Sequence, residues 1–239
     1  MKGMNGMDIS LHALAAASGP YEPRFRAKDP ISALTHFVGF LAAIAATFPL
    51  LVRASCAGCT LTETLSLCGF QAASIALYGA STAYHTFRLG EKGNLVLKRL
   101  DHVMIYVLIV GSYLPICVCA LWGRGGEILL PAVGLIALAG VVFTLFWVTC
   151  PKWLSSCIYI ALGWLSVTAL PQMLAVLPAA AVVFLALGGV LYTVGGVIYA
   201  LKLPGLERRF PGFGAHELFH LFVLAGTACH YWMVFAYLI

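Results

Sequence analysis

Charged side chains are scarce in this chain, because its 14 Lys and Arg and 9 Asp and Glu make up only 10% of 239 residues. Soluble domains carry about 25% charged residues, whereas hydrophobic residues here reach 62% and the mean hydropathy is +0.95. Too little polar surface is available to cover a water-soluble domain of this size. We therefore expect an integral membrane protein.

The apolar stretches also lack the alternation of polar and apolar residues that strands of membrane β-barrels show. Continuous apolar runs of roughly 20 residues predict membrane-spanning helices instead. Pro171 lies near the end of the fifth run and makes it the least regular one. The expected fold is an all-α, seven-transmembrane helix bundle with spans at residues 31–53, 65–87, 99–121, 127–149, 153–173, 178–201 and 215–237.

A cleavable signal peptide is not evident, because the basic cluster of Arg24, Arg26 and Lys28 follows the Ala-rich stretch instead of preceding it. Residues 1–30 are interpreted as a cytosolic tail, with a candidate surface helix at residues 9–17. Residues 31–239 are interpreted as one membrane domain.

Basic residues fall almost entirely on one side of the expected spans, and cytosolic loops carry the excess of Lys and Arg in membrane proteins. With the N-terminus inside, only Arg53 and Arg124 face outward. The other 12 of the 14 basic residues are then cytosolic, namely Lys2, Arg24, Arg26, Lys28, Arg88, Lys92, Lys98, Arg99, Lys152, Lys202, Arg208 and Arg209. We expect a cytosolic N-terminus and an external C-terminus, and no nucleic-acid partner despite the net charge of +5.

Gly188, Gly189, Gly195 and Gly196 repeat at a seven-residue interval in the sixth span. Small residues at such spacing let membrane helices approach closely. The pattern predicts a packing strip with no further role.

Ionisable residues are costly within apolar spans, so each one is a candidate functional residue. His85 ends the second span, Asp101 begins the third and His216 begins the seventh. His36 lies at a similar level in the first span. The topology thus brings histidine or aspartate from four spans to one layer just inside the cytosolic boundary.

His216 and His220 are four residues apart in "HELFH" and project from one helix face. With His85 they supply three imidazole nitrogens, and three protein ligands plus water are the usual form of a catalytic zinc site. We expect Zn²⁺, although copper, iron and nickel also accept imidazole ligands. The alternative is that these histidines only form hydrogen bonds between helices.

Asp101 and Ser81 are the candidate catalytic residues. Asp101 can act as a general base towards water that zinc activates, or it can form a salt bridge with Arg99 or Lys98. Ser81 lies four residues before His85 and shares its helix face. Its hydroxyl can position water or a substrate carbonyl, or it can bond its own i−4 carbonyl.

The remaining histidines of the spans are less informative. His36 is either an additional ligand, a group that supports a ligand, or a structural residue. His102 points about 100° away from Asp101 on an ideal helix, which favours an interfacial role. His230 is ten residues beyond His220, about 15 Å deeper along the helix, where packing or a hydrogen bond between helices is expected.

The His-Glu-x-x-His spacing is also a zinc-protease signature. Acidic residues are absent from the 19 residues that follow His220, so the downstream third ligand of such proteases is missing. A protease is therefore disfavoured, and Glu217 is expected at the charged interface near Arg208 or Arg209.

Four segments resemble, in this order, the hemolysin III group of bacterial membrane proteins: "DPISALTHFVG", "STAYHTF", "KRLDHVMIYVLIVGSYLP" and "HELFHLFVLAGTACH". That group belongs to the progestin and adipoQ receptor family, which also resembles alkaline ceramidases. The resemblance covers roughly residues 28–239. It implies seven helices in a bacterial inner membrane and zinc near the cytosolic face, with functional positions at His85, His216, His220, Asp101 and Ser81.

The resemblance implies lipid chemistry. Eukaryotic members resemble ceramide amide hydrolases or receptors with that activity, and the bacterial branch is linked to cytolysis by its name and to membrane lipid homeostasis. The leading hypothesis is a zinc-dependent hydrolase of a lipid amide or ester, with a membrane lipid as substrate or ligand.

Two other functions remain open from the sequence. One is a non-enzymatic sensor or regulator of membrane state, in which Asp101 or His36 completes the coordination of a structural zinc. The other is a cytolytic pore former, which is disfavoured because a chain with seven spans inserts into its own membrane during synthesis.

Overall fold

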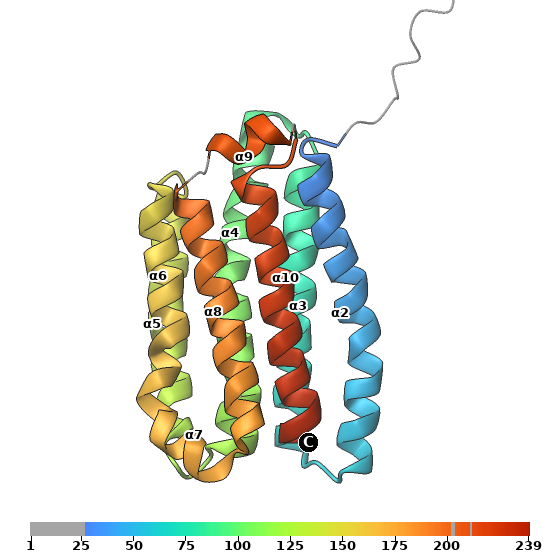
Figure 1. Ribbon diagram of the computed structural model, residues 1–239, viewed down its shortest axis with the longest axis vertical. Coiled ribbons are helices and arrows are strands. Elements are labelled where there is room, and N and C mark those ends of the chain that lie inside the picture. The colour runs from blue at the N-terminus through green and yellow to red at the C-terminus, as the bar shows by residue number, and fades with distance from the viewer. Residues whose placement is uncertain (1–26, 202–203, 211) are drawn as a thin grey trace, which may run out of the picture.

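The computed structural model describes residues 27–201, 204–210 and 212–239, so most of the expected N-terminal tail, including residues 9–17, lies outside the description. The described chain forms an all-helical bundle (Figure 1). Its elements in order are α2 (Pro30–Cys56), α3 (Leu61–Thr86), α4 (Gly90–Pro115), η1 (Ile116–Ala120), α5 (Gly126–Trp147), α6 (Lys152–Trp164), η2 (Leu165–Ala169), α7 (Leu170–Val176), α8 (Ala179–Leu201), α9 (Pro204–Arg209), α10 (Ala215–Met233) and η3 (Val234–Leu238).

Six helical passes of the described chain are long and apolar enough to cross a membrane, at Pro30–Cys56, Gly90–Ala120, Gly126–Trp147, Lys152–Val176, Ala179–Leu201 and Ala215–Leu238. This confirms the all-α class and six of the seven expected spans. The remaining pass, α3, has 26 residues and packs along both α2 and α4. It is less apolar because it turns polar side chains inward, namely Ser66, Gln71, Ser74, Ser81 and His85.

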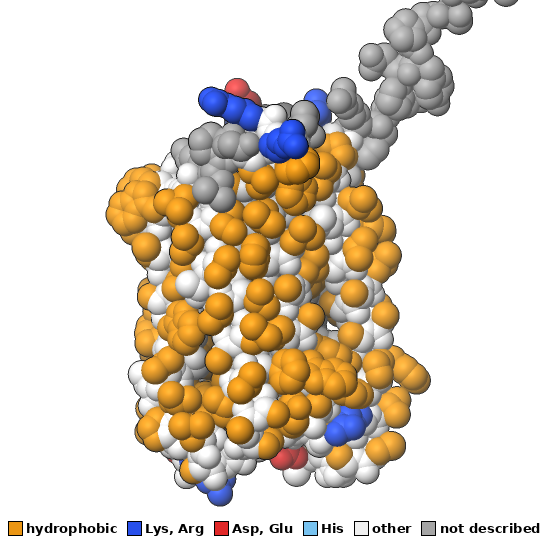
Figure 2. Space-filling view, viewed as in Figure 1, with side chains coloured by type: hydrophobic (Ala, Val, Ile, Leu, Met, Phe, Trp, Pro, Cys, Tyr) orange, Lys and Arg blue, Asp and Glu red, His pale blue; other side chains and the backbone are white. Residues whose placement is uncertain are grey.

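The outer surface of the bundle suits a lipid environment. Figure 2 shows hydrophobic side chains over most of the face in view, while Lys, Arg, Asp and Glu gather towards its two ends. Phe146 on α5 is 86% exposed and Phe48 on α2 is 75% exposed. Contiguous apolar exposure of this kind is unfavourable in water and favourable against lipid chains.

The fifth pass is broken, as Pro171 suggested, but it remains one continuous crossing element. After α6 ends, the Tyr113 hydroxyl of α4 lies 2.7 Å from the Gly163 carbonyl oxygen and accepts a hydrogen bond from the Ser166 N–H at 2.8 Å. Pro171 then occupies the start of α7, where a missing N–H is tolerated. A buried tyrosine thus satisfies the backbone groups freed by the break.

The glycine strip of α8 packs as expected. Gly188 and Gly195 face α10, and Gly189 and Gly196 face α6. A Cβ at Gly188 would overlap the ring of His230, so no larger residue fits without displacing that side chain.

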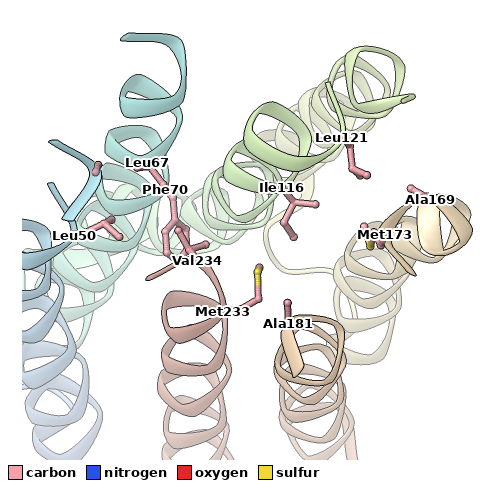
Figure 3. Close-up of a cluster of buried hydrophobic side chains, with 11 residues drawn as sticks. Leu50, Leu67, Phe70, Ile116, Leu121, Ala169, Met173, Ala181, Met233 and Val234 are labelled. Carbon is pink, nitrogen blue, oxygen red and sulfur yellow. The ribbon is translucent and has the colours of Figure 1, made fainter. Parts of the chain in front are cut away.

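A cluster of buried apolar side chains closes the end of the bundle opposite to the start of α2 (Figure 3). It is built by α2, α3, η1, the η2–α7 segment, α8, α10 and η3 from Leu50, Ala54, Leu67, Phe70, Ile116, Leu121, Ala169, Met173, Ala181, Met233 and Val234. The polar layer considered below lies towards the other end, where α2 and α10 begin.

Replacing Gly111 with alanine tests the α3–α4 contact. A Cβ there would lie 2.5 Å from the Ala73 Cβ, an atom that cannot rotate away, so the two helices must separate. Such overpacking typically costs about 1–3 kcal/mol. We expect a lower unfolding temperature for Gly111→Ala in detergent. Gly134→Ala is the matched control, because a Cβ at Gly134 meets nothing within 4 Å. Equal stability of the two variants would contradict this packing.

Candidate metal centre

Helix direction brings the expected site residues into one layer. His85 lies in the last turn of α3, which ends at the level where α10 begins. His216 and His220 occupy the first two turns of α10. His36 belongs to the second turn of α2, which begins at the same end. Antiparallel neighbours of similar length therefore place residues from distant parts of the chain together.

Three imidazoles converge as the sequence predicted. One nitrogen from each of His85, His216 and His220 lies within 4.8 Å of the other two. The Nε2 atoms of His85 and His216 are 3.1 Å apart. The His216 and His220 ring centroids are 4.5 Å apart. These three side chains could hold a metal ion.

The spacing and surroundings of the cluster are compatible with a bound metal ion. A tetrahedral ion with bonds of about 2.0–2.1 Å holds its nitrogen ligands roughly 3.4 Å apart, close to the 3.1 Å seen here. His85 and His220 are each only 2% exposed. The Nδ1 atoms of His216 and His220 are buried with no hydrogen-bond partner among the described residues. Unsatisfied buried nitrogens are costly, and a cation would relieve that cost for whichever nitrogens it binds.

Asp29 belongs to the site and was missed in the sequence. Its Oδ2 lies 2.9 Å from His85 Nδ1. A carboxylate at this nitrogen holds the proton on Nδ1 and leaves the lone pair of Nε2 for a metal. Asp29 is the N-cap residue of α2, yet its side chain makes no capping hydrogen bond. The Asp29 carboxylate therefore contacts His85 and does not cap α2.

The backbone fixes this contact. The Asp29 N–H donates to the His85 carbonyl oxygen at 2.8 Å, and the Lys28 N–H donates to the Thr86 carbonyl oxygen at 3.3 Å. The Lys28 Nζ lies 3.2 Å from the centre of the Tyr84 ring, and partial burial lowers the pKa of Lys28. An Asp before a Pro is an ordinary helix start. The residues "KDP" therefore did not indicate that Asp29 contacts a histidine.

Ser81 and Asp101 both line a cavity that His36, His216 and His220 also line. The Ser81 hydroxyl is buried and has no hydrogen-bond partner among the described residues. Ser74, by contrast, bonds its own i−4 carbonyl on the same helix. The alternative that Ser81 does so is therefore wrong.

Asp101 forms neither of the salt bridges considered from the sequence among the described residues. Its carboxylate lies near His102, whose Nδ1 is 3.5 Å from Asp101 Oδ2. The same Nδ1 is 2.9 Å from the Lys98 carbonyl oxygen. His102 is thus a neighbour of the carboxylate and also lines the cavity.

His36 stacks on a member of the cluster. Its ring lies 3.7 Å from that of His220 with an interplanar angle of 10°. Neither His36 nor Asp101 belongs to the group of converging ligand atoms. His36 therefore supports the ring of His220 rather than adding a fourth nitrogen.

Two other side chains complete the comparison with the sequence. His230 Nε2 lies 3.2 Å from the Leu185 carbonyl oxygen of α8, which confirms a hydrogen bond between helices. Glu217 accepts a hydrogen bond from the Ser32 hydroxyl at 2.7 Å and another from the Gly214 N–H at 2.8 Å. Its bonds therefore tie the start of α10 to α2, whereas the sequence suggested a contact with Arg208 or Arg209.

The cavity beside the histidines has a volume of about 250 Å³. It extends from the polar layer along apolar side chains to the broken fifth pass, reaching Leu170 and Met173. Such a cavity offers polar atoms at one end and an apolar wall along its length.

One known protein family matches most of this chain. The model of the family described as "Haemolysin-III related" matches residues 25–231. The chain belongs to this family. It is a multi-pass membrane protein with a buried three-histidine cluster.

Two bacterial relatives cover nearly the whole chain. A protein named "Hemolysin-3 homolog" from Bacillus subtilis (strain 168) is 35% identical over 214 residues, or 89% of this chain and 96% of its own length. "Hemolysin-3" from Bacillus cereus is 31% identical over 217 residues, or 90% of this chain and 94% of its own length.

Substituting Asp29 tests its support of His85. Asp29→Asn keeps size and N-cap capacity but weakens the acceptor at His85 Nδ1. We expect zinc affinity to fall by about 10–100-fold, measured by competition with a chromophoric chelator. Glu91→Gln on exposed Glu91 of α4 is the control and should bind zinc as the wild type does. Unchanged affinity of Asp29→Asn would remove Asp29 from the site.

Proposed function

We propose that this haemolysin-III related protein is a zinc-dependent hydrolase of a lipid amide or ester and acts in membrane lipid homeostasis. The observation that carries the proposal is the convergence of three buried imidazoles beside a cavity that also exposes Ser81 and Asp101. His85, His216 and His220 would hold the ion. Zinc at such a site supplies a Lewis acid that polarises a carbonyl and lowers the pKa of water.

The chain's own residues account for the remaining steps. Asp101 accepts a proton from the attacking water while the water oxygen bonds to the carbonyl carbon. Asp101 then gives that proton to the departing amine or alcohol as the bond from the carbonyl carbon to that group breaks. The Ser81 hydroxyl, which has no other described partner, donates a hydrogen bond to the carbonyl oxygen. The apolar wall of the cavity receives the acyl chain and excludes bulk water. The products are a fatty acid and an amine or alcohol.

The ligand count supports a hydrolase over a sensor with structural zinc. Structural zinc sites are closed by four protein ligands, whereas catalytic sites keep an open position. The converging group contains three nitrogens, and neither Asp101 nor His36 completes it. An open position next to a cavity favours chemistry on a bound molecule.

Asp101→Asn and His216→Ala separate chemistry from metal binding. We expect Asp101→Asn to retain zinc and to lose at least 10²-fold in turnover, because it lacks the general base. His216→Ala should lose both zinc and turnover. The measurement is fatty acid released from a bacterial membrane lipid extract by purified protein, followed by mass spectrometry, with metal content determined in parallel. Full release by metal-free wild-type protein would refute the proposal.

We also propose that the protein lies in the bacterial inner membrane with the start of α2 in the cytosol and the C-terminus outside. The distribution of Lys and Arg supports this orientation. Figure 1 has the start of α2 and the C-terminus at opposite ends of the bundle, as seven passes require.

Cysteine labelling tests the orientation, since Cys56 is a free, exposed thiol at the end of α2. A membrane-impermeant maleimide should label the protein in intact spheroplasts, and Cys56→Ser combined with Cys59→Ser should abolish that signal. In this double variant, Lys92→Cys should become labelled only after lysis. The reverse pattern would invert the topology.

A further inference from the structure

A second pocket lies beside the cavity of the candidate metal centre. Its volume is about 260 Å³, and its lining includes Lys98, His102, Thr149, Lys152, Ser155 and Tyr199. These residues come from the start of α4, the loop before α6, the first turns of α6 and the end of α8. The proposed hydrolytic chemistry uses none of them.

The lining of this pocket is strongly cationic for a membrane protein so poor in charge. Two lysines face it, and its described lining contains no Asp or Glu. Lys98 makes no ion pair with any described residue. The Nζ of Lys152 lies 4.1 Å from the centre of the Tyr199 ring, which places its charge against that wall of the pocket. Asp101 lies in the neighbouring cavity, where its Oδ2 is 3.5 Å from His102 Nδ1.

The backbone adds to this positive potential. The pocket surrounds the N-terminus of α6, a helix of 13 residues. No side chain caps this N-terminus, so its first N–H groups carry the partial positive charge of a helix start. The Thr149 hydroxyl lines the same pocket as a further polar group, whereas the Ser155 hydroxyl donates to the Lys152 carbonyl oxygen at 3.0 Å. Lysines, uncapped N–H groups and hydroxyls are the groups that bind phosphate.

The position of the pocket connects it to the proposed reaction. His102 and Tyr199 line both this pocket and the cavity with the histidines, so the two spaces share a wall. Lys98 and Lys152 lie towards the end of the bundle that carries most of the Lys and Arg, where headgroups of an anionic leaflet would meet the protein. Basic pockets between membrane helices at this level bind phosphate-bearing headgroups.

We propose that this pocket binds the phosphate of an anionic lipid headgroup and thereby makes phospholipids the substrate class of the adjoining site. This inference rests on the proposed hydrolase for its second part, whereas phosphate binding itself requires no metal. With its phosphate held by Lys98 and Lys152, a phospholipid would extend its acyl chain into the neighbouring cavity. The acyl linkage, which lies between the phosphate and the chain, would then be beside Asp101.

Binding measurements on the full chain in detergent test the first part without relying on catalysis. The probes are dioctanoyl phosphatidylglycerol, dioctanoylglycerol with the same chains but no phosphate, and inorganic phosphate, each titrated by calorimetry with chelator present. We expect the phospholipid to bind at least tenfold more tightly than dioctanoylglycerol. Lys98→Gln combined with Lys152→Gln should remove that tenfold preference and leave dioctanoylglycerol binding unchanged.

The matched control is Arg88→Gln combined with Lys92→Gln, which removes two exposed charges from the same end of the bundle outside the pocket. It should bind phosphatidylglycerol within twofold of the wild type. An equal loss in both double variants would overturn the proposal, because attraction by net charge would then explain binding. Inorganic phosphate that binds as tightly as the phospholipid would make soluble phosphate the ligand and overturn the lipid assignment.

Fatty acid release separates this inference from the proposed function. Phospholipid binding that depends on the two lysines, with no release of fatty acid, would refute the hydrolase and retain the phosphate site. Zinc-dependent release that is equal for the wild type and for Lys98→Gln combined with Lys152→Gln would retain the hydrolase and refute the phospholipid substrate.

Discussion

The close approach of three imidazoles inside an apolar bundle is the constraint on which the histidine end of this structure depends. The Nε2 atoms of His85 and His216, 3.1 Å apart, can share one proton in a hydrogen bond or can bind one cation. A proton would serve one pair, but it would leave His220 Nδ1 without a partner among the described residues. A bound cation would contact all three side chains at once and would thereby tie α3 to α10.

The two ends of the bundle are stabilised by different interactions. Opposite to the histidines, a dry cluster of Leu, Phe, Ile and Met side chains joins nearly every pass without any requirement for polar partners. At the histidine end, hydrogen bonds link neighbouring helices instead. Asp29, before α2, contacts His85 of α3, and Glu217 of α10 bonds Ser32 of α2. Between these ends, the cavity interrupts close packing. The apolar cluster on one side and the hydrogen bonds on the other hold the helices together around this space.

The sequence predicted the helices and the three-histidine cluster well, because both follow from periodicity and from the alternating direction of successive passes. His85, His216 and His220 had to meet once three helices of known direction ended or began at one level. Asp29 could not be recognised, since its residue type and its place before Pro30 already have an ordinary explanation as a helix cap. The stacking of His36 on His220 and the bonds of Glu217 depend on the rotation of each helix about its axis. The apolar periodicity of the sequence does not define that rotation closely enough to predict which side chains contact each other.

The separation of the ligands along the chain has a consequence for biogenesis. His85 emerges from the ribosome early, whereas His216 follows it by 131 residues and belongs to the final pass. Before α10 is inserted, the chain offers only His85 of the three clustered imidazoles, and one ligand binds divalent ions weakly. Tight retention of metal would therefore require that α10 has joined the bundle beside α3.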